Sequence, residues 1–386
     1  MPPLEDQARD LLSRLVAQPS VNPMRAEPSG PPFGEGAMAD CLADLLAGWG
    51  AQVERREFAP GRVNLLARFR GERDDRALLL EAHADTVSHE GMTVPPFEPA
   101  VRDGRLFGRG SCDCKGPMTA VLLGLKRVLE DRGRPPATVT FVATGDEEFG
   151  AGGARALMAD GFRADAAVVA EPTDLAVVHA HKGAYRCRIV TRGRGAHSSE
   201  PSSGASAIRM MARVVEALEG PLAEALARRR HPVLGPPTVS VGTIRGGTAV
   251  NIVPDRCEIE VDRRLVAGED AQAIRAEFVR ALDALAEADP AFRYDIEERE
   301  WYPPFQEDPE GPVARLVRDA CERVLGRADL AAVPWSANVG VFRAAGIPCV
   351  LFGPGAIAQA HTADESIALA DVARAAEVYA EIVRRF

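Results

Sequence analysis

Four short apolar runs in this chain each lead into acidic residues or a histidine. The runs are Ala77–Leu80, Val139–Ala143, Ala166–Ala170 and Pro348–Phe352, and stretches with helical spacing such as Met118–Glu130 lie between them. This order predicts an α/β fold with a mostly parallel sheet that helices cover on both faces. In such open sheets ligands bind at the carboxyl ends of the strands.

Side chains that can bind metal or move protons follow all four runs. In chain order they are His83 and Asp85, Glu147 and Glu148, Glu171 and, beyond a Gly-Pro-Gly loop, His361. Carboxylates and imidazoles gathered at one sheet edge would repel each other without a cation. We therefore expect a metal site at this edge.

Taken alone, each motif also has a structural interpretation. His83 and Asp85 lie on the same side of an extended segment, so Asp85 could support a metal-bound His83 or both could end a strand. Asp113, on a glycine-rich turn before a helix, could bridge two cations or cap the helix. Glu147 and Glu148 point to opposite faces, so one could bind metal and the other act as a base, or both could be solvated.

Two cysteines, Cys112 and Cys114, flank Asp113. If this segment is extended, Asp113 points away from both thiols. No second cysteine pair lies nearby to complete a thiolate zinc site, so we expect both cysteines to be structural. His197, between glycines and serines, is by itself an ordinary loop histidine.

The middle of the chain follows a different pattern. Strands alternate with two helices in the order β-α-β-β-α-β of the ferredoxin-like unit. The expected elements are Tyr185–Val190, Ala205–Leu218, Thr238–Ile244, Cys257–Leu265, Ala271–Ala288 and Arg293–Glu298. We therefore predict a small α+β domain at 181–295, inserted into a catalytic domain made from residues 1–180 and 296–386.

Composition narrows the possible partners. The 386 residues include 46 basic and 56 acidic ones, a formal net charge of −10, so we expect no binding to nucleic acid or anionic lipid. No run approaches the roughly 18 apolar residues of a membrane span, and the first residues lack the order of a signal peptide. Seven scattered cysteines favour the reducing cytoplasm over a disulfide framework.

In their order along the chain these segments resemble the di-zinc aminoacylase and deacetylase family of metallopeptidases. Its members include acetylornithine deacetylase, succinyl-diaminopimelate desuccinylase and glutamate carboxypeptidases. The resemblance runs from His83 to His361, and residues 242–247 and 353–361 look most like acetylornithine deacetylase. Cys114 stands where a methionine is common, and Ser336–Asn338 where many members have Thr-Asp, a departure that we expect to alter substrate contacts.

The resemblance implies a set of metal ligands. They are His83, Asp113, Glu148, Glu171 and His361. Asp113 bridges two divalent ions in this arrangement, and His83 with Glu171 completes one ion's shell while Glu148 with His361 completes the other. Mixed imidazole and carboxylate ligands favour zinc, and cobalt or manganese also fits.

The resemblance implies further roles outside the ligand set. Asp85 orients His83, and Glu147 is the general base. His197, Asn251 and Arg264 meet the substrate from the inserted lid domain. In dimeric members the lid histidine and asparagine reach the partner's site, so we also expect a homodimer through the inserted domain.

These expectations define an amide hydrolase that removes the acyl group from an N-acyl amino acid, of the N-acetylornithine type. The alternative substrates within the family are a succinylated diamino acid or a short peptide. A catalytically inactive binding protein on the same scaffold is a further alternative, which metal analysis would distinguish. A purely structural zinc site conflicts with carboxylate-rich ligands, because structural sites favour cysteine.

Overall fold

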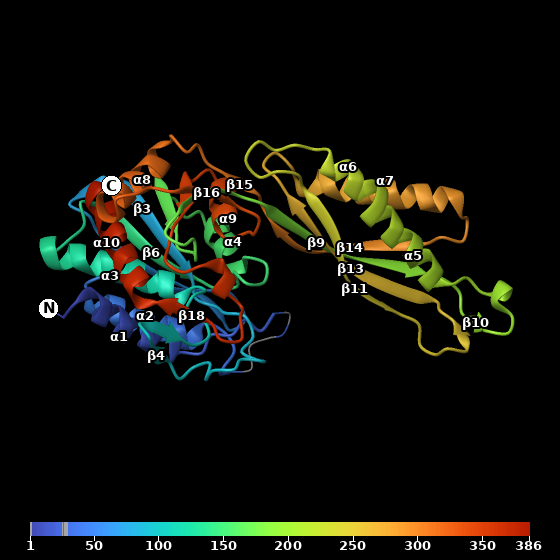
Figure 1. Ribbon diagram of the computed structural model, residues 1–386, viewed down its shortest axis with the longest axis horizontal. Helices are drawn as coiled ribbons and strands as arrows, with labels where there is room; N and C mark the ends of the chain where they lie inside the picture. Colours follow the sequence, from blue (N-terminus) through green and yellow to red (C-terminus); the bar gives the residue numbers. More distant parts are fainter. Residues whose placement is uncertain (1, 25, 27–29) are drawn as a thin grey trace. The chain divides into compact units, whose positions relative to one another are not determined.

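The computed structural model describes residues 2–24, 26 and 30–386 (Figure 1). Residues 25 and 27–29 belong to the stretch 19–34, which its proline and glycine content predicts to be a loop, and they lie outside the described residues. The chain divides into two compact units. The larger unit is Met1–His179, Gln306–Ala332 and Ala337–Phe386, and the second is Ala180–Phe305 with Val333–Ser336.

A mixed sheet, nine-stranded among the described residues, forms the centre of the larger unit. Its order is β1 (Gln52–Ala59), β2 (Arg62–Phe69), β6 (Ala137–Thr144), β3 (Arg73–His83), β7 (Ala166–Val169), β17 (Cys349–Leu351), β8 (Val177–His181) and β15 (Phe305–Gln306), with β16 (Leu330–Val333) beside β8. The central strands β6, β3, β7 and β17 are parallel, whereas β1, β2 and β8 pair antiparallel with their neighbours. The predicted α/β class is confirmed, and the four parallel strands are the four apolar runs.

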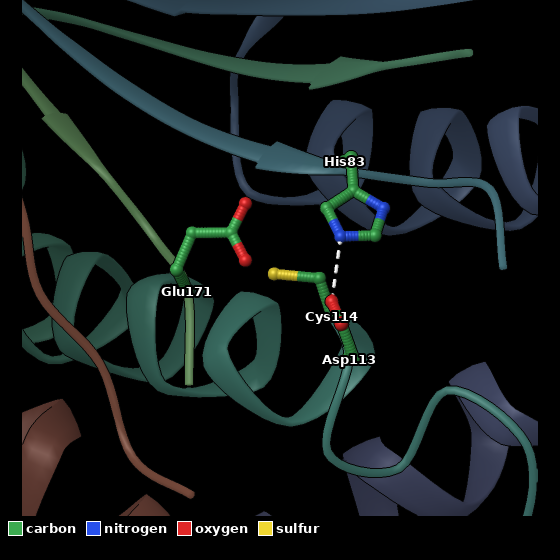
Figure 2. A group of neighbouring side chains, drawn as sticks. All are labelled: His83, Asp113, Cys114 and Glu171. Carbon is green, nitrogen blue, oxygen red and sulfur yellow. Dashed lines mark hydrogen bonds and ion pairs between the residues drawn. The ribbon is translucent and has the colours of Figure 1, made fainter. Parts of the chain in front are cut away.

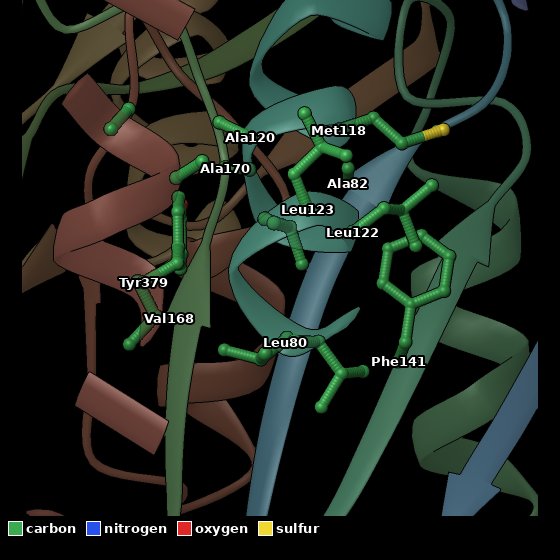
Figure 3. Close-up of a cluster of buried hydrophobic side chains, with 14 of the residues drawn as sticks. Leu80, Ala82, Met118, Ala120, Leu122, Leu123, Phe141, Val168, Ala170 and Tyr379 are labelled. Atoms are coloured by element: carbon green, nitrogen blue, oxygen red, sulfur yellow. The ribbon is translucent and has the colours of Figure 1, made fainter. Parts of the chain in front are cut away.

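The parallel strands are apolar because the sheet is covered on both faces. Every residue of β6 and β7 is buried, as are the last six residues of β3. Figure 3 shows Leu80, Phe141 and Val168 from these three strands beside Leu122 of a covering helix. Continuous apolar runs rather than alternating ones are typical of such doubly covered strands.

The larger unit contains seven α-helices among its described residues. They are α1 (Leu4–Val16), α2 (Gly36–Gly48), α3 (Lys115–Arg132), α4 (Gly152–Ala159), α8 (Pro312–Leu325), α9 (Val339–Ala344) and α10 (Leu369–Arg385). Helices α3 and α10 approach so closely that a Cβ at Gly124 would lie 2.6 Å from the carbonyl oxygen of Ala376. Tyr379 of α10 donates a hydrogen bond to the carbonyl oxygen of Phe352, just after β17, at 2.5 Å. These contacts hold α3, whose first residue follows Cys114, firmly against the core.

The second unit has the β-α-β-β-α-β order. Its elements are β9 (Gly183–Arg192), α5 (Ala207–Ala217), β11 (Thr238–Gly246), β13 (Arg256–Leu265), α7 (Ala271–Ala288) and β14 (Tyr294–Tyr302). All pairings in its sheet, ordered β11-β13-β9-β14, are antiparallel. The unit extends beyond the expected residue 295 because β14 continues to Tyr302 and pairs with β9 over most of its length.

Small elements complete both units. In the larger unit β18 (Ser366–Ala368), β5 (Arg105–Phe107) and β4 (Ala100–Arg102) form a three-stranded sheet. In the second, β10 (Ala196–His197) pairs with β12 (Ile252–Val253), and the helical segments η2 (Leu218–Leu222) and α6 (Ala223–Ala227) follow α5. None of the helices within the described residues is both long and apolar enough to cross a membrane.

Candidate metal centre

The carboxyl edge of the parallel sheet carries most of the expected metal-binding residues. His83 is the last residue of β3, Glu148 follows β6, and Glu171 follows β7. Because these strands are parallel neighbours, their ends meet at one edge. Asp113 reaches the same place from the turn before α3, and His361 from the loop after β17.

Four buried side chains form a first group of possible metal donors, which Figure 2 shows. They are His83, Asp113, Cys114 and Glu171, and one ligand atom from each lies within 4.8 Å of all the others. His83 Nε2 lies 2.8 Å from Asp113 Oδ1. Imidazole nitrogen, carboxylate oxygen and thiol sulfur are the donors that zinc accepts.

Asp113 also belongs to a second group, with Glu148 and His361. Its other oxygen, Oδ2, lies 3.5 Å from His361 Nε2, and that nitrogen lies 3.1 Å from Glu148 Oε2. The His361 side chain is 51% exposed, whereas those of Asp113 and Glu148 are nearly buried. One carboxylate thus faces two histidines with its two oxygens, which is the geometry that a bridging ligand requires.

Comparison with known proteins agrees with this geometry. Residues 79–385 match the description "Peptidase family M20/M25/M40". The chain belongs to this family. The family resemblance inferred from the motifs is therefore confirmed, and the M20 chain is a metal-dependent amide hydrolase.

Individual relatives of this M20 chain cover nearly all of it. It is 31% identical over 357 residues to the acetylornithine deacetylase of Myxococcus xanthus, covering 90% of this chain and 92% of the relative. An M20 metallo-carboxypeptidase from Sulfolobus solfataricus matches its structure with a TM-score of 0.81 at 19% identity, over 98% of each chain. A dinuclear metal-binding M20 peptidase from Bacillus subtilis matches with a TM-score of 0.72 at 17% identity, over 99% of this chain and 98% of the other.

The electrostatics of the M20 centre favour a bound cation. Burial raises the pKa of Glu147 and Glu171 well above the usual range, and neighbouring carboxylates raise it further against the opposing effect of His83. Hydrogen bonds with Asp113 and Glu148 raise the pKa of His361 to about 10. The side chains are thus costly to leave as bare anions, and a divalent cation held by their nitrogen and oxygen donors would offset that cost.

Asp85 joins the His83 strand end to the Glu147–Glu148 turn. Its carboxylate accepts hydrogen bonds from the backbone N–H groups of Glu147 and Glu148, both at 3.1 Å, and from Asn22 Nδ2 at 2.7 Å. His83 Nδ1 donates to the backbone carbonyl of Asp85 at 2.9 Å, while the carboxylate oxygen lies 3.7 Å from that nitrogen. Within the larger unit Asp85 therefore contacts His83 mainly through its backbone.

Glu365 supports the turn that carries Asp113, and the motif analysis did not single it out. Its buried carboxylate accepts hydrogen bonds from the backbone N–H groups of Gly110, Cys112 and Asp113, at 2.8–2.9 Å, and from Arg109. Asp113 and Glu365 are 252 residues apart in the sequence. No local pattern in the sequence could signal this contact, since an acidic residue four positions after His361 is unremarkable by itself.

One expectation about this region is wrong, and another residue has contacts that the sequence did not indicate. Cys114 does not point away from Asp113, because residues 109–114 form a turn rather than an extended segment, and its sulfur joins the first donor group. Asn338 is fully buried and donates hydrogen bonds to Glu81 Oε1 and Thr144 Oγ1, both at 3.0 Å. The Asn338 side chain therefore belongs to a buried polar cluster with Glu81 and Thr144, and the expected effect of the Ser336–Asn338 departure on substrate contacts stays a prediction.

The residues expected to meet substrate belong to the second unit. His197 and Asn251 are exposed, and the backbone carbonyl of Asn251 accepts a hydrogen bond from Ser198 at 3.0 Å. The two segments therefore lie side by side, as the pairing of β10 with β12 also requires. Arg264 is half-buried on β13, opposite Ala184 at the start of β9, and its Nε lies 2.7 Å from Asp262 Oδ1.

Proposed function

We propose that this M20 hydrolase removes the acyl group from a small N-acyl amino acid, with N-acetylornithine as the first substrate to test. The observation that carries the proposal is the position of Asp113, whose two oxygens face the separate donor groups of His83 and His361. The acetylornithine deacetylase relative supports the substrate class. The dinuclear metal-binding M20 peptidase supports two ions per chain.

In this proposal each ion has its own side chains. His83 and Glu171 would hold one ion, Glu148 and His361 would hold the other, and Asp113 would contribute to both. Zinc fits these donors best, and cobalt or manganese also fits. When bound, such ions supply Lewis acidity and lower the pKa of a water molecule toward neutrality.

Glu147 is proposed as the general base. It is buried beside the donor groups, and the hydrogen bond from its backbone N–H to Asp85 fixes the start of the turn. Its carboxylate takes a proton from the attacking water and then delivers that proton to the leaving nitrogen. The raised pKa of this carboxyl, caused first by burial, suits a group that must both accept and release a proton.

The second unit is proposed to bind the rest of the substrate. His197 would stabilise the negative charge that develops on the carbonyl oxygen, and Asn251 lies beside it. Arg264, whose Nε lies 2.7 Å from Asp262 Oδ1, would pair with the substrate carboxylate through its guanidinium group.

A substrate panel tests the proposal. N-acetylornithine, N-succinyl-diaminopimelate and dipeptides are assayed with added Zn²⁺, Co²⁺ or Mn²⁺, and metal content is measured on the same samples. We expect fastest turnover of the acetylated substrate with about two metal ions per chain. Faster dipeptide cleavage would favour the peptidase alternative, which the carboxypeptidase-like structure supports. A metal-free, inactive protein would favour a binding function.

We also propose a cytoplasmic homodimer formed through the second unit. Strand β11 lies at the edge of its sheet with most side chains exposed, and Ile244 (58% exposed) and Val250 (102%) add apolar surface there. Unpaired edge strands with exposed apolar residues pair readily with a second copy. Ile244→Lys should shift light scattering from dimer to monomer. A monomeric wild-type protein, or a dimer unchanged by the charge, would contradict this interface.

The cytoplasmic location is supported by the cysteines. All seven cysteines are free, which suits a reducing compartment.

A further inference from the structure

The sulfur of Cys114 lies among the donors of the first metal group. Its side chain is fully buried, and Sγ is within 4.8 Å of donor atoms of His83, Asp113 and Glu171. Figure 2 shows the sulfur directed into the space that these side chains share. In this structure the thiol donates a hydrogen bond to the carbonyl oxygen of Ala170, at 2.9 Å.

Cys112 shows that burial alone does not produce this arrangement. It is equally buried and lies two positions away, but its sulfur is 3.5 Å from the carbonyl oxygen of Ala356 and belongs to neither donor group. The two thiols therefore differ in direction rather than in burial, and of the two only Cys114 faces the metal donors.

We propose that Cys114 Sγ is a ligand of the ion held by His83, Asp113 and Glu171, and that it makes this position selective for thiophilic metals. The inference rests on the proposed two-ion function. One imidazole nitrogen, two carboxylate oxygens and one thiolate would give this ion four protein donors, one more than the three of an open catalytic zinc site, so a bound water would be its fifth ligand. On loading, the thiol proton leaves to solvent, the S–H···O contact with Ala170 breaks, and the sulfur–metal bond replaces both.

The second group offers only nitrogen and oxygen donors, from Asp113, Glu148 and His361. The two positions of the centre should therefore differ in metal preference. Sulfur favours Zn²⁺ and Co²⁺ over Mn²⁺, whereas a site of one imidazole and two carboxylates discriminates less. We expect a mixed centre when zinc and manganese are supplied together, with zinc in the first group.

Cobalt spectroscopy tests the sulfur ligand directly. The wild-type protein loaded with Co²⁺ should show the near-ultraviolet charge-transfer absorption of a thiolate–cobalt bond in addition to visible bands. Cys114→Ser should lose the near-ultraviolet band while the visible bands persist, and Cys112→Ser should keep both. In the zinc-loaded protein, X-ray absorption should show a sulfur neighbour at about 2.3 Å beside nitrogen and oxygen neighbours at about 2.0–2.1 Å.

The outcomes separate this inference from the proposed function. Wild-type protein that binds about two cobalt ions without the charge-transfer band would overturn the sulfur ligand and leave the metal centre intact. Protein that binds no cobalt would overturn the metal centre itself. Because the wild-type spectrum is decisive, misfolding of Cys114→Ser would not prevent the test. If that variant folds, its preference for Zn²⁺ over Mn²⁺ should fall by about tenfold or more, and an unchanged preference would contradict the selectivity.

Discussion

The two units of this chain hold their functional residues in contrasting ways. In the larger unit His83, Asp113 and Glu171 are buried and fixed by contacts with strands and turns far apart in the sequence. In the second unit His197 and Asn251 are exposed, and they are held by the contact of His197 with Ser199 and by the pairing of the short strands β10 and β12. The difference leads us to expect that the metal-binding residues all belong to the larger unit, and that substitutions at His197 and Asn251 leave metal binding unchanged.

The sharpest test of this contrast within the larger unit is Glu147→Ala. Removal of the proposed base should lower kcat by about 10³–10⁴-fold, because both proton transfers lose their carrier, while metal content stays near the wild-type value. Glu148→Ala is the matched control, since this adjacent residue should lose metal as well as activity. Near-normal turnover of Glu147→Ala would remove this residue from the base role.

His361→Ala should remove one of the two proposed metal ions and leave the other bound. This half-exposed histidine belongs to the second donor group only, so its loss should remove about one metal ion per chain, and kcat should fall by about 10²–10³-fold as that ion's several kcal/mol of charge stabilisation disappears. Elemental analysis after dialysis measures the change. His179→Ala, a histidine of the larger unit outside both groups, should retain the full complement. Equal metal content in the two variants would argue against the ligand role.

His197→Ala tests the second unit in the same way and should impair catalysis without removing metal. Because His197 lies in the second unit, metal content should be unchanged, while kcat falls by about 10²-fold through loss of one donor to the developing oxyanion. Steady-state kinetics together with metal analysis tests both halves of this statement. His231→Ala, another histidine of the same unit, is the control. Loss of metal in the His197 variant would show that the units are not independent in this sense.

The smallest effect is expected for Glu365→Gln. The side-chain amide of the Glu365→Gln variant would place an N–H group against one of the backbone N–H groups of Gly110, Cys112 or Asp113 that donate to Glu365. The turn that carries Asp113 should therefore loosen, and metal affinity should fall by about 10–100-fold. With saturating metal most activity should return, which a direct catalytic role would not allow. Asp364→Asn, an exposed neighbour, should bind metal like the wild type. Competition with a chelator measures the affinities.

The wrong and the missed predictions share one cause. Cys114 was expected to point away from Asp113, and the buried hydrogen bonds of Asn338 with Glu81 and Thr144 were not predicted. Both come from side chains on turns or loops, where direction depends on the whole fold rather than on a local period. Glu365 was missed for a related reason, since its four donors lie about 250 residues earlier in the chain.

The sequence by itself determined the α/β class, the family and the gathering of His83, Glu148 and Glu171 at one edge. It could do so because buried parallel strands read as continuous apolar runs and end together. Only the tertiary structure decided that the two oxygens of Asp113 face different histidines, that the sulfur of Cys114 lies among the donors, and that Glu365 holds the turn. Those directions are set by packing between distant segments, which no local spacing encodes.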